Sequence, residues 1–174
     1  MPININGSYG ISLNNGVVLG SNQSNILQIK RVSAGPTRQT IASLTPVLLT
    51  GLQITITPIS ALSTMIITAN IAKSDGFVIS FGIFKNGVAT VSTTGQTNTN
   101  EPNMQVTNYT KDNNNYFAQS VAMHYEPSVD TAARTYGVYG TSGWAGVVYT
   151  FYVNDRVTSD MACFSTLDVM EVLI

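Results

Sequence analysis

The stretch that most constrains how this chain can fold is residues 50–72, TGLQITITPISALSTMIITANIA. It contains no ionisable side chain, but Thr, Ser and Pro interrupt it too often for a membrane-spanning helix, which needs ~20 mostly apolar residues in a row. Apolar residues instead recur at every second position, at Leu52, Ile54, Ile56, Met65, Ile67, Ala69 and Ile71. A period of two is typical of a strand with one buried face. We therefore expect two adjacent strands of a sheet, the first ended by Pro58.

The same alternation continues through most of the chain. Ile79, Phe81 and Ile83 line up before Asn86-Gly87, a pair that tolerates the positive φ angles of a two-residue hairpin turn. The remaining alternating stretches lie at 27–32, 38–49, 117–126, 134–140, 146–155 and 165–174, with a turn expected at 141–143. About eight to ten short strands without a convincing helix are typical of an all-β sandwich or barrel.

The first 26 residues differ from the rest of the chain because they are rich in Gly and Asn. Their short apolar group, Val17, Val18 and Leu19, lies among turn-forming residues and cannot bury enough surface to fold alone. We expect residues 1–26 to be an extended attachment arm and residues 27–174 to form one domain, since 174 residues are about one domain in length.

Charge is scarce on this chain. Charged residues make up 10% of it, and eight Lys+Arg against nine Asp+Glu leave a formal net charge of -1. Without a basic surface to neutralise phosphates, nucleic-acid binding is not expected. A nearly neutral surface gives little repulsion between copies, which favours assembly into a larger particle over a concentrated free monomer.

The N-terminal residues and the cysteine content indicate where the protein folds. MPININGSYG lacks the basic and apolar regions of a secretory signal, and the single cysteine, Cys163, cannot form an intramolecular disulfide. We expect synthesis and folding in a cytoplasm and no insertion into a membrane.

Residues suited to catalysis or metal binding are few and scattered. His124 is the only histidine, no Gly-x-Ser-x-Gly elbow occurs, and nothing places His124 beside Cys163, which is expected to be a small buried hydrophobe. The other candidates are Asp112, Asn113, Asn114, Asn115, Asp155, Asp160 and Asp168. The Asp-Asn run does not match a calcium loop, and nothing marks any one of these acids as buried. We therefore expect no enzymatic activity, no metal and no cofactor.

Aromatic residues are concentrated in one region, at Tyr136, Tyr139, Trp144, Tyr149 and Tyr152. Aromatic side chains serve sandwich cores, but they also stack on sugars. Trp144, between glycines in the predicted turn region, is the best candidate for an exposed recognition residue. A polar loop predicted over 92–115 would place Asn113, Asn114 and Asn115 on the same recognition surface.

The order of several motifs resembles that of small virion proteins of tailed bacteriophages, especially those of aquatic hosts. The motifs are LLTGLQITITPISALSTMIITANIA (48–72), FGIFKNG (81–87), HYEPSVDTAARTYGV (124–138), YVNDRVTSD (152–160) and STLDVMEV (165–172). The resemblance covers about Leu27 to Ile174. It departs from the family at the turn after Asn154, where Asp155 displaces the usual Arg to Arg156.

The resemblance implies a jelly-roll sandwich of the tumour-necrosis-factor-like kind that assembles as a homotrimer at the virion surface. Such a protein would be a capsid decoration or head-fibre protein contacting capsid or tail proteins. A receptor-binding tail-fibre tip that recognises host surface glycan is one alternative, and a cellular carbohydrate-binding module or adhesin is another. The apolar chain end separately favours contact with sister copies, through a face formed by Met170, Val172 and Ile174.

Overall fold

The computed structural model describes residues 4–6, 10–12, 18–19, 25–74, 78–90, 104, 106–109, 117–144, 146–155 and 163–173. These residues contain strands and turns but no helix, and therefore no helix long and apolar enough to cross a membrane. The strands are β1 (Asn4–Asn6), β2 (Gly10–Ser12), β3 (Val18–Leu19), β4 (Asn25–Ala34), β5 (Gln39–Ile41), β6 (Val47–Ile56), β7 (Ser63–Ser74), β8 (Val78–Lys85), β9 (Val88–Ala89), β10 (Val106–Tyr109), β11 (Phe117–Pro127), β12 (Arg134–Trp144), β13 (Val147–Val148), β14 (Phe151–Val153) and β15 (Ser165–Leu173).

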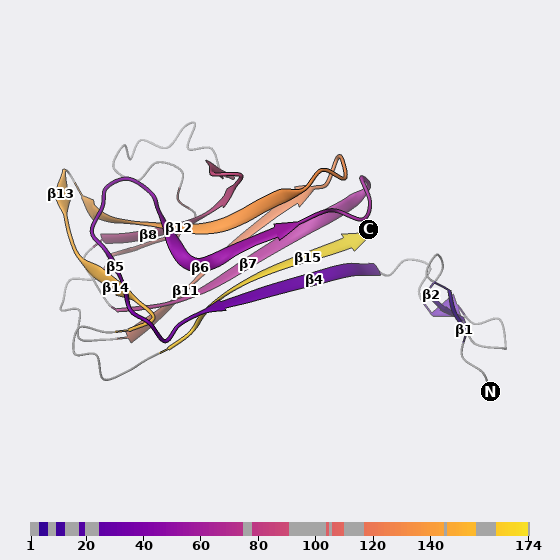
Figure 1. The fold of residues 1–174 in the computed structure, drawn as a ribbon, viewed down its shortest axis with the longest axis horizontal. Coiled ribbons are helices and arrows are strands. Elements are labelled where there is room, and N and C mark those ends of the chain that lie inside the picture. Colours follow the sequence, from indigo (N-terminus) through magenta and orange to yellow (C-terminus); the bar gives the residue numbers. More distant parts are fainter. Residues whose placement is uncertain are drawn as a thin grey trace.

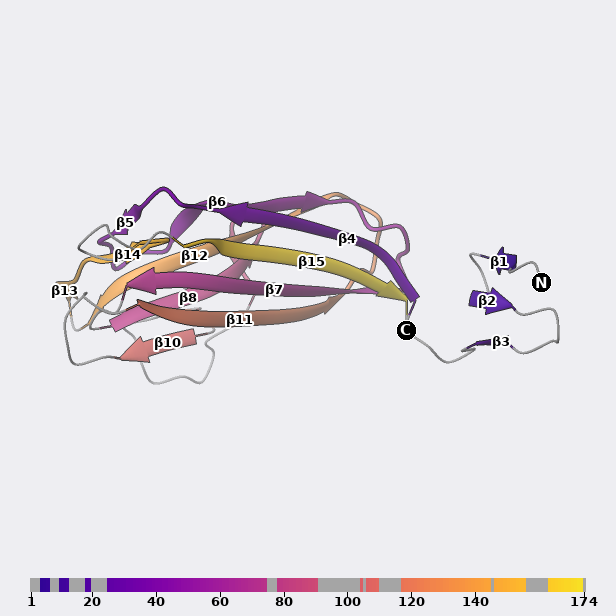
Figure 2. The same cartoon turned by 90° about the horizontal axis from the view of Figure 1, so that it is seen from below.

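Two antiparallel sheets stack face to face as a sandwich (Figures 1 and 2). Sheet I has the order β4-β15-β7-β11, and β14 and β5 extend it near Lys73 at the end of β7. Sheet II has the order β6-β12-β8-β10, with the short strands β9 and β13 added to β8 and β12. The all-β sandwich expected from the sequence is confirmed.

The order of the strands shows how the chain alternates between the sheets. The two four-stranded orders contain eight strands, which follow one another in the chain as β4, β6, β7, β8, β10, β11, β12 and β15. Counted in this way, sheet I contains the first, eighth, third and sixth strands, in that spatial order. Sheet II contains the second, seventh, fourth and fifth. This is the strand order of a jelly roll, in which two Greek keys form a double sheet.

The uncharged stretch at 50–72 forms β6 and β7, and the alternation predicted for it is confirmed. Its seven predicted inward residues, from Leu52 to Ile71, are all buried at 4% exposure or less. The expectation that the two strands are adjacent in a sheet is wrong, because β6 belongs to sheet II and β7 to sheet I. The link around Pro58 crosses the sandwich, so the two apolar faces pack against each other through the core.

The second half of the chain confirms some turns and corrects others. Asn86 and Gly87 join β8 to β9 with φ angles of 51° and 80°, as the predicted hairpin requires. Val106 begins the short strand β10, as expected. The turn predicted at 141–143 is wrong, because β12 continues to Trp144 and its residues Thr141 and Ser142 pair with β8.

Strand β11 alternates as predicted, but its apolar face points away from the core. Ser120 and Ala122 are buried, whereas Val121, Met123 and Tyr125 are 51%, 47% and 59% exposed. Since both faces of β11 contain some apolar residues, the period of two could not show which face is buried.

In the C-terminal strand β15, Met170 and Val172 lie on one face but differ in burial. The pairing of β15 with β7 runs without a shift from Thr166 to Leu173, and the shift against β4 comes from an extra residue of β4, Leu27. Met170 is half-buried, whereas Val172 is only 4% exposed and offers little surface to a partner. Strand β15 is also a central strand, between β4 and β7, so neither of its edges is unpaired along the sheet.

Candidate interaction surfaces

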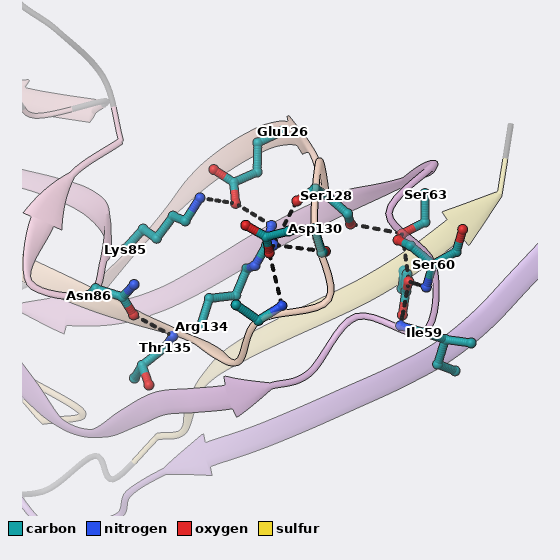
Figure 3. A network of polar contacts seen from close by, with 12 residues as sticks. Ile59, Ser60, Ser63, Lys85, Asn86, Glu126, Ser128, Asp130, Arg134 and Thr135 are labelled. Atoms are coloured by element: carbon teal, nitrogen blue, oxygen red, sulfur yellow. Dashed lines mark hydrogen bonds and ion pairs between the residues drawn. The ribbon is translucent and has the colours of Figure 1, made fainter.

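Polar side chains gather at the end of the sandwich where β11 ends and β12 begins (Figure 3). Glu126, next to the end of β11, lies at the centre of this group. Its Oε1 atom accepts hydrogen bonds from the Tyr136 hydroxyl at 2.5 Å and from Arg134 Nη1 at 3.4 Å, and lies 2.9 Å from Lys85 Nζ. We call Glu126, Lys85, Arg134, Tyr136 and the neighbouring His124 the Glu126 cluster.

The Glu126 carboxylate stays charged at every physiological pH. Burial alone would raise the pKa of this carboxyl, but hydrogen bonds from three neighbours, of which His124 is the strongest, outweigh burial and lower the pKa to about 2. Burial and the hydrogen bond to Glu126 raise the pKa of the Tyr136 hydroxyl, so this hydroxyl stays protonated as a donor. The cluster thus links the ends of β8, β11 and β12 by charge-assisted hydrogen bonds.

Arg134 fastens the turn between β11 and β12. Its side chain is only 3% exposed, and its Nη2 donates to the carbonyl oxygen of Ser128 and to Asp130 Oδ1, both at 2.6 Å. The Ser128 hydroxyl lies 2.8 Å from the hydroxyl of Ser63, the first residue of β7. This contact connects the β11–β12 turn to the β6–β7 link (Figure 3).

Glu171, two residues before the end of β15, is a second buried carboxylate at the same end. It accepts hydrogen bonds from the Ser63 hydroxyl at 2.5 Å and from Gln28 Nε2 at 2.6 Å. The backbone N–H groups of Ile59 and Ser60 also donate to it, at 2.9 and 3.0 Å. Burial alone would raise the pKa of this carboxyl, but the hydrogen bonds, led by that from Ser63, lower it.

Both carboxylates connect separate elements, and each already accepts several hydrogen bonds. His124, whose Nε2 lies 3.6 Å from Glu126 Oε2, belongs to the same group and points inward from β11. Among the residues that the structure describes, no group of three or more His, Cys, Asp and Glu could hold a metal ion. This arrangement suits a rigid end of the sandwich better than a proton-transfer site.

The outer face of sheet I carries an apolar band. By strand register, Ile29 of β4, Met170 of β15, Ile66 of β7 and Tyr125 of β11 form one row across the sheet. Met123 and Val121 extend the row along β11. We call these residues the outer apolar band: Ile29, Ile66, Val121, Met123, Tyr125 and Met170. Ile29 and Tyr125 are each 59% exposed, and contiguous exposed apolar surface of this kind marks an interaction site.

Next to the band, the outer face of sheet I carries polar side chains, and one ion pair lies among them. Asp168 of β15 lies opposite Arg31 of β4, and Arg31 Nε donates to Asp168 Oδ1 at 2.6 Å. Beyond this pair, the face is completed by Thr68, Asn70, Thr166 and Ser33. The surface is therefore nearly neutral and moderately apolar, which lowers the cost of removing it from water.

The residues that the sequence predicted as an interface differ in their exposure. Met170 lies in the outer apolar band, Val172 is buried at 4% exposure, and Ile174 lies outside the described residues. In the predicted arm, Val18 and Leu19 form β3, which pairs with β2 in a small sheet of its own, whereas Val17 is outside the described residues. The role of these residues in attachment stays a prediction.

The predicted recognition surface is described only in part. The backbone of Trp144 ends β12 and pairs with Val147, but its side chain lies outside the described residues, as do Asn113, Asn114 and Asn115. Among the other aromatic residues, Tyr136 is fully buried and Tyr139 stacks on Phe84 with ring centroids 4.3 Å apart. Cys163 is half-buried, not fully buried as expected.

Sequence reasoning missed the residues of β11 that form most of the exposed band. The period of two gave this strand two faces without showing which one is buried, and the structure buries the smaller residues Ser120 and Ala122. Glu126 lies on that same inward face, where it contacts Lys85 and Arg134 of two other strands. Such a contact cannot be seen in one strand alone.

Comparison with known proteins gives little further information. No protein-family model matches the chain, and no curated protein matches it. One similar solved chain, described as "Structure of infectious bursal disease virus Gx strain", has 9% sequence identity and a TM-score of 0.34. The match covers 95% of this chain but 42% of that one, so this chain spans less than half its length. At this TM-score the similarity supports no argument about function.

Proposed function

We propose that this protein is a non-enzymatic structural component of a bacteriophage particle, a homotrimeric capsid decoration or head-fibre protein at the particle surface. The observation that carries the proposal is the outer apolar band, which crosses all four long strands of sheet I. Its residues on the outer strands, Ile29, Val121, Met123 and Tyr125, are exposed on the isolated chain, and Ile66 and Met170 between them are half-buried. A surface of this composition loses little solvation when covered by sister copies.

Two further features support the proposal. Charged residues make up only 10% of the chain, so a free monomer would have little charge repulsion to keep it apart from other copies. The motif order from Leu27 to Ile174 resembles that of small phage virion proteins. In this proposal residues 1–26 attach the sandwich to neighbouring capsid or tail subunits.

Sedimentation velocity at micromolar concentration tests assembly through the band. We expect the full chain to sediment as a trimer and the double variant Val121→Lys/Tyr125→Lys to sediment as a monomer, because a charge buried in an apolar interface is costly. Leu62→Lys and Val88→Lys are matched controls, since Leu62 and Val88 are exposed apolar residues outside the band. A full chain that stays monomeric, or a double variant that stays trimeric, would contradict this interface.

A second candidate within the same class is a receptor-binding tip of a tail fibre, which a pocket lined by Arg38, Thr40 and Thr50 would suit. Imaging of intact particles labelled with an antibody against this chain separates the two. Label spread over the shell is expected for decoration, and label confined to the tail tip would instead establish the receptor-binding alternative.

A further inference from the structure

A pocket lies beside strands β5 and β14. These two strands are at the end of the sandwich opposite to the one where β11 ends and β12 begins (Figure 1). The volume of the pocket is about 540 Å³, within the range of roughly 300–1,000 Å³ usual for small-molecule sites. The side chains that line it are those of Thr37, Arg38, Gln39, Thr40, Thr50 and Asn154. None of these residues was singled out by the sequence as a recognition residue.

The pocket exists because strand β6 bulges. Pairing between β12 and β6 shifts between Gly137 and Tyr139, and on β6 Leu49 and Leu52 are both buried while Thr50 and Gly51 are both exposed. Gly51 has φ 82°, and a Cβ added there would lie 3.1 Å from the Cβ of Ala34 on β4. The bulge therefore turns the Thr50 side chain outward and requires glycine at the next position, residue 51.

Hydrogen bonds hold the pocket walls in place. The Gln39 side chain bridges the bulge, since Nε2 donates to the Leu48 carbonyl at 3.0 Å and Oε1 accepts from the Thr50 N–H at 2.7 Å. Asn154 is 3% exposed with a left-handed φ of 64°, and its Oδ1 accepts from the Ser165 hydroxyl at 2.6 Å. A site built on such anchored residues is preorganised, which reduces the entropic cost of binding a ligand.

The charge of the pocket selects the kind of ligand. Arg38 supplies a cation, but Asp155 compensates it at 3.1 Å, and the guanidinium lies 4.4 Å from the centre of the Tyr152 ring. The lining thus presents threonine hydroxyls and a compensated guanidinium on a largely apolar wall, while the Gln39 amide and Asn154 Oδ1 are engaged in holding the walls. Such a lining has no excess charge, and it suits a neutral molecule that combines hydroxyl groups with apolar faces better than an acidic or basic one.

From this geometry we infer that the pocket binds a neutral saccharide unit. The inference does not depend on the proposed homotrimer, because none of the residues of the outer apolar band lines the pocket. It applies equally to a decoration protein and to a fibre tip, since either could use a glycan contact at a particle surface.

Saturation-transfer difference NMR on the full chain tests the inference. The probes are D-glucose, D-galactose, D-mannose and N-acetyl-D-glucosamine, with N-acetylneuraminic acid as the acidic probe. We expect at least one neutral sugar to bind and the acidic sugar to bind more weakly. Binding of no neutral sugar, or stronger binding of the acidic one, would overturn the inference.

Variants of Thr50 localise the binding. Thr50→Val removes one hydroxyl without changing shape and should weaken the affinity about fivefold, because a single neutral hydrogen bond is lost. Thr50→Tyr should abolish binding by filling the pocket. Thr57→Val and Thr57→Tyr are the matched controls, since Thr57 is exposed just beyond the other end of β6. Unchanged binding in Thr50→Tyr, confirmed as folded by circular dichroism, would place the sugar elsewhere and overturn the proposed site.

Discussion

At the scale of residues, the buried carboxylate of Glu171 joins several elements at one end of the sandwich. Four donors from two separate segments converge on it: Gln28 of β4, and the Ile59 N–H, the Ser60 N–H and the Ser63 hydroxyl of the stretch 59–63. A carboxylate offers only acceptors, which matches a site surrounded only by donors. The carboxyl group stays ionised although it is buried, because each of these donors stabilises its negative charge.

Replacing Glu171 with Gln tests this role. The amide would place its own N–H groups against the existing donors, so we expect the free energy of unfolding to fall by about 3 kcal/mol. Urea denaturation followed by fluorescence measures the change. Asp168→Asn on the same strand is the control, and it should have a much smaller effect because Asp168 pairs with the exposed Arg31. Equal losses in the two variants would contradict a special role for Glu171.

The same residues predict how stability depends on pH. Folding lowers the pKa of Glu171 and Glu126 below the ordinary value of 4.5, to about 2 for Glu126. Their contribution is therefore complete above about pH 5 and is lost as the pH falls through the folded-state pKa values. Thermal unfolding measured from pH 6 to pH 2.5 should show a steady loss of stability, and the loss should be smaller in Glu171→Gln. A flat profile would count against this assignment.

Val129 stores strain in the β11–β12 turn. It has φ 52°, a left-handed conformation that is unfavourable for a β-branched residue, and it is 70% exposed. Val129→Gly should therefore raise the free energy of unfolding by about 1 kcal/mol, as measured by urea denaturation. Val88→Gly is the control, because Val88 is equally exposed but lies in strand β9, where Gly should lower stability by about 0.5–1 kcal/mol. Destabilisation by both changes would show that Val129 is not strained.

At the scale of elements, two glycines illustrate different constraints on turns. Gly87 closes the β8–β9 hairpin with φ 80°, and an added Cβ would meet nothing within 4 Å. Gly143, with φ 151°, lies where β12 approaches β13, and an added Cβ would collide with the Leu44 side chain and the Val147 carbonyl oxygen. The first position is limited by backbone conformation alone, and the second also by space.

Alanine at these two positions should therefore have unequal effects. We expect Gly87→Ala to lower the free energy of unfolding by about 1–2 kcal/mol, the cost of a left-handed L-residue. Gly143→Ala should cost more, because the Val147 backbone must also move. Urea midpoints of the two variants measure the difference. A smaller effect at Gly143 than at Gly87 would show that β13 moves away easily.

At the scale of the whole molecule, the arm and the sandwich are distinct. Within the described part of the chain, β1, β2 and β3 pair with one another and not with either six-stranded sheet. The last strand, β15, is in contrast central in sheet I, with Leu167 and Val169 completely buried. The two ends of the chain should thus differ in their importance for folding.

Truncation tests this difference. Deleting residues 1–24 should leave the Tm within a few degrees of the full chain, because no strand of the two large sheets is removed. Deleting residues 165–174 should abolish the cooperative thermal transition seen by circular dichroism, because β4 and β7 lose their shared partner. A large drop in Tm on removal of residues 1–24 would show that the arm is part of the folded unit.

Much of the strand content followed from local chemistry alone. Apolar core residues recur at every second position from Leu52 to Ile56 in β6, from Met65 to Ile71 in β7 and from Ile79 to Ile83 in β8. Asn86-Gly87 can adopt the φ angles of a tight turn. Each of these properties belongs to a short segment and its own side chains. For that reason the sequence was sufficient to predict an all-β sandwich and most of its core.

Only the tertiary structure decided the sheet to which each strand belongs and the face that it buries, because both depend on contacts between distant segments. The placement of β6 and β7 in opposite sheets, the outward face of β11 and the bulges at Gly51 and Leu27 all arise when eight strands pair across long stretches of chain. A period of two gives a strand two faces but does not show which of them meets the core. The outer apolar band and the pocket beside β5 form only once the strands have paired in this way.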